Sequence, residues 1–151
     1  MHDVPYNGDP SRVEAVTGAR EAVEAARRAG LRVGIVTNQS GVARGLITRE
    51  QVDAVNARVR ELIGPVDTWQ VCPHGPDDGC ACRKPAPAMI LAAARELGVE
   101  PYECAYIGDQ PSDAAAAYAA GARPILVTSG DPDDGIAETA GTLVAAVARL
   151  T

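Results

Sequence analysis

The chain has 151 residues, of which 46% are hydrophobic and 23% charged, and its formal net charge is −6 at pH 7. This length predicts a single domain over 1–151, and the apolar content argues against a disordered chain. The negative charge disfavours binding to nucleic-acid phosphates and to anionic membranes, so we expect neither as a partner.

Helical and strand patterns alternate along the chain. Thr48 with Gln51 is a capping-box pattern that begins one helix, and Pro87 suits the first turn of another. In chain order we expect a loop over 1–13, a helix over 18–29, a strand over 31–37, a helix over 48–63, a strand over 67–71, a loop over 72–84, a helix over 87–97, a strand over 104–107, a helix over 111–120, a strand over 124–128 and a helix over 141–150. Short connections between such units predict an α/β fold with a doubly wound parallel sheet.

Three of the four cysteines and one of the two histidines follow the pattern C-x-H-x5-C-x-C. Thiolates and imidazole are preferred zinc ligands, and the turn over 75–79 can bring two ligand pairs onto one tetrahedral ion. The candidate ligands are Cys72, His74, Cys80 and Cys82. Four ligands would fill the coordination shell, so we expect a structural Zn²⁺ ion. Two disulfides or free buried thiols are the alternatives, and a nucleic-acid-binding zinc module is disfavoured by Asp77 and Asp78.

Polar residues follow several of the expected strands, where open α/β sheets bind their ligands. Thr37 comes before Asn38-Gln39-Ser40, Lys84 is the only lysine, and Asp109 and Asp113 flank the start of a helix. A hydroxyl, an ammonium and a hard oxygen ligand for Mg²⁺ suit phosphoryl transfer. Each also has an ordinary interpretation, as a loop, a solvated cation or acids that favour a helix N-terminus.

The order of these residues resembles the haloacid dehalogenase (HAD) superfamily of phosphatases, in which a Thr or Ser after a strand, a Lys, and a Gly-Asp pair with a further acid form successive motifs. Within it, four segments look like the D-glycero-D-manno-heptose 1,7-bisphosphate 7-phosphatase family. They are TNQSGVARG (37–45), CPH (72–74), CxCRKP (80–85) and IGDQPSD (107–113). The related histidinol-phosphatases share most of these features.

The resemblance implies a HAD-type (Rossmann-like) sheet and a Mg²⁺-dependent phosphatase that works through an aspartyl-phosphate. It implies that Thr37 and Lys84 hold the transferred phosphoryl group and that Asp109 and Gln110 lie at the Mg²⁺ ion. The substrate-binding residues that it implies are Asp3, Val4, Pro5, Tyr6, Thr37, Asn38, Gln39, Ser40, Arg83 and Lys84. Histidinol phosphate or another sugar phosphate is an alternative substrate.

The first motif of the superfamily, D-x-D-G-T at the end of the first strand, is absent from these residues. It carries the aspartate nucleophile and the acid/base aspartate. A buried strand contributes roughly 6–12 kcal/mol through some four apolar side chains, so we expect this chain alone to be unstable and weakly active or inactive. Either the start is misassigned and a phosphatase strand lies upstream, or the chain is a non-catalytic remnant that binds zinc and phosphate.

No apolar stretch approaches the ~20 residues that span a bilayer, and the first residues do not resemble a secretory signal. We therefore expect a cytoplasmic protein. The family resemblance implies a small phosphorylated sugar as its substrate. The family resemblance favours a monomer.

Overall fold

A computed structural model of the protein describes residues 11, 17–39, 41–75, 78–128 and 137–150. The loop expected over 1–13 lies outside the described residues except for Ser11. None of the helices formed by the described residues is long and apolar enough to cross a membrane.

Helices and strands alternate as the sequence predicted. The helices are α1 (Ala19–Arg28), α2 (Arg49–Ile63), α3 (Ala88–Leu97), α4 (Pro111–Ala120) and α5 (Leu143–Ala148), with a short 3₁₀ helix η2 (Pro101–Glu103). The strands are β1 (Gly34–Asn38), β2 (Thr68–Cys72), β3 (Ala105–Gly108), β4 (Arg123–Val127) and β5 (Glu138–Ala140). β5 was not expected, because three residues are too few to show a periodic pattern.

Two helix starts show how local sequence sets the boundaries. Thr48 and Gln51 form the expected capping box: the Gln51 N–H donates to Thr48 Oγ1 over 3.1 Å, and the Thr48 N–H donates to Gln51 Oε1 over 2.8 Å. Pro87, expected in the first turn of α3, is instead its N-cap residue. The helix therefore begins one residue later than expected, at Ala88.

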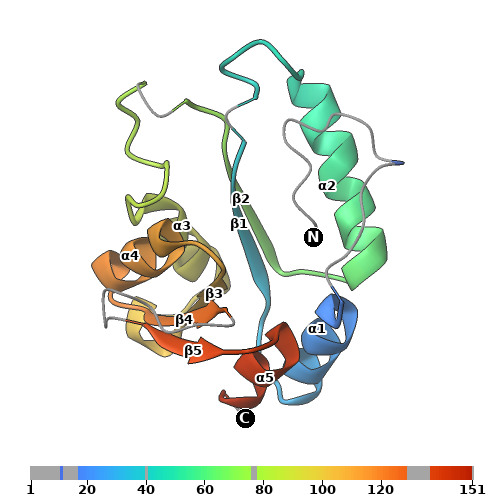
Figure 1. The fold of residues 1–151 in the computed structure, drawn as a ribbon, viewed down its shortest axis with the longest axis vertical. Helices are drawn as coiled ribbons and strands as arrows, with labels where there is room; N and C mark the ends of the chain where they lie inside the picture. The colour runs from blue at the N-terminus through green and yellow to red at the C-terminus, as the bar shows by residue number, and fades with distance from the viewer. Residues whose placement is uncertain (1–10, 12–16, 40, 76–77, 129–136, 151) are drawn as a thin grey trace.

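The strands form two parallel groups. β1 pairs with β2, from Gly34 opposite Thr68 to Asn38 opposite Cys72. β3 pairs with β4, and β4 pairs with β5. The parallel pairing is as expected. Among the described residues, β1 and β3 are not paired with each other, so these five strands do not form one continuous sheet. Figure 1 shows β1 and β2 running between α2 on one side and α3 and α4 on the other, with β3, β4 and β5 as a separate group.

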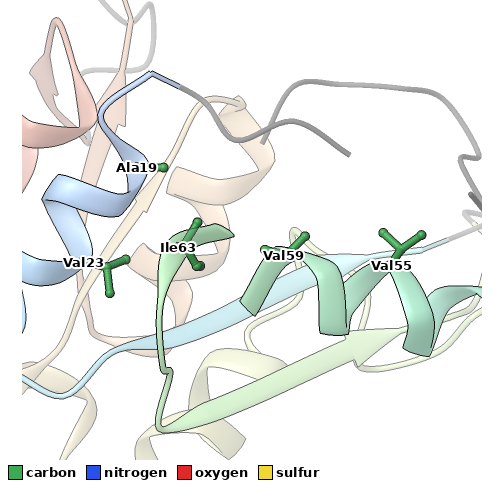
Figure 2. Packing of buried hydrophobic residues seen from close by; sticks show 5 residues of the cluster. All are labelled: Ala19, Val23, Val55, Val59 and Ile63. Atoms are coloured by element: carbon green, nitrogen blue, oxygen red, sulfur yellow. The ribbon is translucent and has the colours of Figure 1, made fainter. Parts of the chain in front are cut away.

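Small and branched apolar side chains form the core. One cluster joins α1 and α2: Val55, Val59 and Ile63 lie in a row along α2, and Ala19 and Val23 approach from α1 (Figure 2). A second cluster packs the completely buried Ala116 and Ala117 of α4 against Ile90 of α3. Because alanine has only a methyl group, α3 and α4 pack closely, and burial per residue is modest.

Candidate functional site

The carboxyl end of β1 carries the first expected phosphate ligand. Thr37 and Asn38 are the last residues of β1, and both are half-buried. The Gln39 amide Nε2 donates to Thr37 Oγ1 over 3.2 Å, and the Gln39 N–H donates to the carbonyl of Cys72 over 2.7 Å. The Thr37 hydroxyl is therefore held at a loop that is joined to the end of β2.

Lys84 links the two strand groups. Its backbone N–H donates to Asn38 Oδ1 over 3.2 Å, which anchors it to the end of β1. Its ammonium forms a salt bridge with Asp113 of α4 and donates to the Tyr106 hydroxyl of β3 over 3.3 Å. The Lys84 side chain is 13% exposed and that of Asp113 is 6% exposed, so Lys84 is a largely shielded partner of a buried carboxylate rather than a solvated cation.

Asp113 organises the turn between β3 and α4. Its Oδ2 accepts the backbone N–H groups of Asp109 and Gln110, each over 3.1 Å, while Oδ1 faces Lys84. A Cβ on Gly108 would lie 2.4 Å from the Asp113 side chain, closer than any real Cβ contact. This accounts for the glycine of the Gly108-Asp109 pair, because a residue without a side chain leaves the space that the Asp113 carboxylate occupies.

Tyr106 completes this cluster, and sequence reasoning missed it. Its hydroxyl lies 3.3 Å from the carbonyl oxygen of Val36 and 3.4 Å from Asp113 Oδ1. Burial, and then the Asp113 charge, raise the pKa of Tyr106 well above its usual value. The phenol is therefore a neutral hydrogen-bonding group. The one available signal in the sequence was a tyrosine within an otherwise apolar strand. It did not reveal the role of Tyr106, because the hydrogen-bond partners of its hydroxyl are distant in sequence.

Asp109 and Gln110, the expected Mg²⁺ residues, are both exposed beside this cluster. Their side chains offer a carboxylate and an amide oxygen, which are the hard ligands that Mg²⁺ takes. Because Asp113 holds both backbone N–H groups, the turn that carries these two side chains is fixed next to the Lys84 ammonium. The donor set fits a Mg²⁺ ion that keeps open positions for water or phosphate oxygens.

The four candidate zinc ligands come together as predicted, with their ligand atoms within 4.8 Å of one another. Cys72 Sγ lies 3.6 Å from Cys80 Sγ, 2.9 Å from Cys82 Sγ and 3.5 Å from His74 Nδ1. Three sulfurs and one nitrogen around a tetrahedral Zn²⁺ ion lie roughly 3.5–3.8 Å apart, as Cys72 does from Cys80 and His74. Cys82 Sγ lies closer than this range to Cys72 Sγ, and it is 3.2 Å from His74 Nδ1. All four cysteines of the chain are free rather than disulfide-bonded, so the cluster fits a metal.

The thiols of this cluster differ in proton affinity. Desolvation raises the pKa of Cys80, but hydrogen bonds from the Arg83 backbone and from Cys72 and Cys82 outweigh it and lower the value to about 7. Desolvation, together with the neighbouring Cys72 and Cys80, raises the pKa of Cys82 to about 12. Several thiolates packed together repel one another, which disfavours the loss of all their protons. A divalent cation bound by the thiolates would offset this repulsion.

Arg83 connects the cysteine loop to the rest of the site. Its guanidinium donates to the carbonyl of His74 over 3.3 Å, and the next residue is Lys84. The cysteine cluster therefore lies directly against the segment that positions the ammonium. The remaining expected substrate residues, Ser40 and 3–6, lie outside the described residues.

A hydroxyl, a buried ammonium and exposed oxygen ligands thus meet where β1 and β3 end, which is the usual ligand-binding edge of an α/β sheet. The model of the haloacid dehalogenase-like hydrolase family matches residues 9–121. The chain belongs to this family.

Individual relatives narrow the comparison. The chain is 39% identical, over 89% of its length and 82% of the relative's, to a D-glycero-beta-D-manno-heptose-1,7-bisphosphate 7-phosphatase of Pseudomonas putida. It is 42% identical to the enzyme of the same name from Pseudomonas aeruginosa, over 73% of the chain and 64% of the relative. The crystal structure of the D,D-heptose 1,7-bisphosphate phosphatase from B. bronchiseptica, complexed with magnesium and phosphate, superposes with a TM-score of 0.84 at 34% identity, covering 95% of this chain and 87% of that one. The HAD-type α/β fold predicted from the motifs is confirmed.

Proposed function

We propose that this chain forms the phosphate- and metal-binding part of a phosphatase site that removes the 7-phosphate of a D-glycero-D-manno-heptose 1,7-bisphosphate. One observation carries the proposal: the only lysine of the chain is largely shielded from water, paired with Asp113 and hydrogen-bonded to the residue that follows Thr37. A surface lysine would not be held in this way. The similarity to phosphatases of that name supports the substrate.

In this proposal Thr37 and Lys84 bind the transferred phosphoryl group. The Lys84 ammonium neutralises phosphoryl oxygens as a point charge, for which its compact head suits better than a planar guanidinium. Asp109 and Gln110 hold a Mg²⁺ ion, which supplies positive charge to the phosphoryl oxygens when bound. The remaining residues that contact the sugar phosphate are Asp3, Val4, Pro5, Tyr6, Asn38, Gln39, Ser40 and Arg83.

A Zn²⁺ ion on the four-ligand cluster has a structural role in this proposal. Cys72, His74, Cys80 and Cys82 fill a tetrahedral shell and leave no position for a reacting water. The ion instead fixes the loop that ends in Arg83 and Lys84. The protein works in the cytoplasm as a monomer, where reducing conditions keep these thiols available for metal.

Turnover needs an attacking aspartate, and no D-x-D-G-T segment occurs among the 151 residues. We therefore expect these residues to bind the phosphorylated substrate and to hydrolyse it weakly or not at all. Binding, rather than turnover, is the property that the described site can be tested for.

Calorimetric titration of the zinc-loaded chain in Mg²⁺ tests this. Heptose 1,7-bisphosphate should bind more tightly than heptose 1-phosphate, and more tightly than histidinol phosphate, which represents the related enzymes. Lys84→Gln should weaken binding at least about tenfold, because a charge-assisted contact to phosphate contributes ~1.5–3 kcal/mol.

Arg95→Gln is the matched control, since it also removes one positive charge but lies on the exposed surface of α3. Thr37→Ser, which keeps the hydroxyl, should bind more tightly than Thr37→Val. Equal affinity of the bisphosphate for the Lys84→Gln and Arg95→Gln variants, with both folded, would contradict the proposed phosphate site.

A further inference from the structure

The hydrogen-bond donors of the Lys84 ammonium are divided between the protein and a ligand. A lysine ammonium carries three N–H donors and no acceptor. In the described part of the chain, Asp113 Oδ1 takes one donor in the salt bridge, and the Tyr106 hydroxyl oxygen takes a second over 3.3 Å. Because these two partners are fixed, the tetrahedral geometry at Nζ sets the direction of the third N–H, which remains for a ligand.

The Tyr106 hydroxyl is itself held in place by two further contacts. It lies 3.3 Å from the carbonyl oxygen of Val36 and 3.4 Å from Asp113 Oδ1, and either oxygen can accept the single phenolic proton. Burial, and then the Asp113 charge, raise the pKa of Tyr106 well above its usual value, so the phenol keeps this proton at neutral pH. The hydroxyl can therefore donate one hydrogen bond and at the same time accept an N–H of Lys84.

The contact with Val36 relates the ammonium to Thr37. Val36 precedes Thr37 in β1, so the Tyr106 hydroxyl joins the ammonium to the strand that carries the proposed phosphate-binding hydroxyl. The backbone N–H of Lys84 donates to Asn38, the residue after Thr37, over 3.2 Å. Lys84 is thus anchored to both neighbours of Thr37, through its side chain on one side and through its backbone on the other.

The neutral charge of the phenol suits a phosphate site. A second carboxylate in place of Tyr106 would also hold the Lys84 ammonium, but it would repel phosphate oxygens. The phenol orients the ammonium without offsetting its positive charge. Phenylalanine would keep the aromatic ring, whose centroid lies 5.7 Å from Nζ, and would remove only the hydroxyl.

We propose that Tyr106 is a positioning residue of the phosphate site: its hydroxyl directs the third N–H of Lys84 to the same phosphoryl group that the Thr37 hydroxyl contacts. This inference rests on the proposed function, because it assigns Lys84 and Thr37 to one phosphate. Tyr106 acts through the ammonium rather than on the phosphate, so its effect on binding should require Lys84.

The ammonium can be observed directly, because Lys84 is the only lysine. NMR spectra of the zinc-loaded full chain, labelled with ¹⁵N at the lysine Nζ, should contain one ammonium signal. Its protons should exchange with water more slowly than those of free lysine. Tyr106→Phe should speed this exchange by about two- to tenfold, the range for the loss of one hydrogen bond. Tyr118→Phe, which removes an exposed hydroxyl from α4, should not change it.

Inorganic phosphate is the ligand for the second measurement, by calorimetric titration in Mg²⁺. Tyr106→Phe should weaken phosphate binding by about two- to tenfold, again through one lost hydrogen bond. The same change in a Lys84→Gln background should have no further effect, because a residue that acts through the ammonium shows full coupling to it. Tyr118→Phe should bind phosphate as the original chain does, and urea unfolding at pH 7 checks that each variant is folded.

Three results would overturn the proposal. They are ammonium exchange in the original chain as fast as in free lysine, exchange that Tyr106→Phe leaves unchanged, and an equal loss of phosphate affinity on Tyr106→Phe with and without Lys84. The first needs no variant, so it tests the proposal even if Tyr106→Phe does not fold. The third would mean that Tyr106 supports only the fold.

Failure of the proposed function would look different. An original chain that binds no phosphate, but whose ammonium exchange depends on Tyr106, would contradict the phosphate site while confirming that Tyr106 orients Lys84. The exchange measurement needs no ligand, so the two ideas are tested separately.

Discussion

The two polar clusters of this protein are built over very different sequence distances. The Cys/His cluster draws all its ligands from 72–82, which are the last residue of β2 and the loop that follows it. The Lys84 cluster joins residues 22 and 29 positions away, Tyr106 and Asp113, and ties them to Asn38, 46 positions earlier. The first is a local motif that one ion can complete, and the second exists only when both strand groups are in place. Their stabilities should therefore respond to different perturbations.

Metal removal should produce the largest effect. A chelator should lower the melting temperature strongly, because without a cation nothing neutralises the closely packed thiolate and imidazole ligands. The binding of structural Zn²⁺ contributes ~10–16 kcal/mol in small zinc domains. Cys80→Ser should do the same without a chelator. Thermal unfolding with metal analysis measures both.

Cys104→Ser is the control for this prediction, because Cys104 is half-buried in a different cluster of side chains. It should leave a metal content of one ion per chain. A chain that carries no zinc and melts at the same temperature with and without chelator would disprove the structural ion.

Breaking the buried ion pair should come next in size. Asp113→Ala leaves the Lys84 ammonium without its carboxylate in a site that is nearly closed to water, and such a loss costs about 3–5 kcal/mol. The free energy of unfolding from urea titrations measures it. Glu61→Gln removes the exposed partner of Arg58 and should cost about 0–1 kcal/mol. Similar losses for the two variants would mean that the Lys84 pair is solvated.

A single methyl group should test the packing beneath this pair. Gly108→Ala forces a Cβ against the Asp113 side chain and should cost about 1–3 kcal/mol. Gly141→Ala is the matched change, because a Cβ there meets no atom within 4 Å and the residue has no positive φ. Urea unfolding of both variants compares them, and a tolerated Gly108→Ala would show that the turn before α4 can shift.

The smallest effect should be a change in pH dependence. Burial and the Asp113 charge raise the pKa of Tyr106 above its usual value of 10.0, so the unfolded phenol ionises before the folded one. Its contribution to stability is complete below pH 10 and is lost as the pH rises above it, with a slope of at most about 1.4 kcal/mol per pH unit. Tyr106→Phe should therefore flatten the alkaline decline in the free energy of unfolding.

Tyr102→Phe is the control for this pH profile, because Tyr102 is 77% exposed. It should keep the slope of the original chain. Identical profiles for the Tyr106→Phe variant and the original chain would show that the phenol at position 106 is reached by water.

Much of the fold was readable because its signals are local. Thr48 with Gln51 marked the start of α2, and the strands expected over 31–37 and 124–128 correspond to β1 and β4. β5 was missed since three residues carry no period, and it is defined only by pairing with β4. The extents of the expected strands shifted by up to three residues at their ends, as with β1, because a strand ends where its backbone partner ends rather than where its composition changes.

The sequence by itself determined the order of elements, the grouping of the four candidate metal ligands and the family, because each depends on residue types at short spacings. The tertiary structure decided what Lys84 does. Only the approach of β1 to α4 turns a lone cation into a buried pair with Asp113, brings in Tyr106, and leaves β1 and β3 facing each other across an apolar cleft. Contacts between residues far apart in the chain depend on how the helices and strands pack. The spacing of residues along the sequence does not give the distances between them in the folded protein.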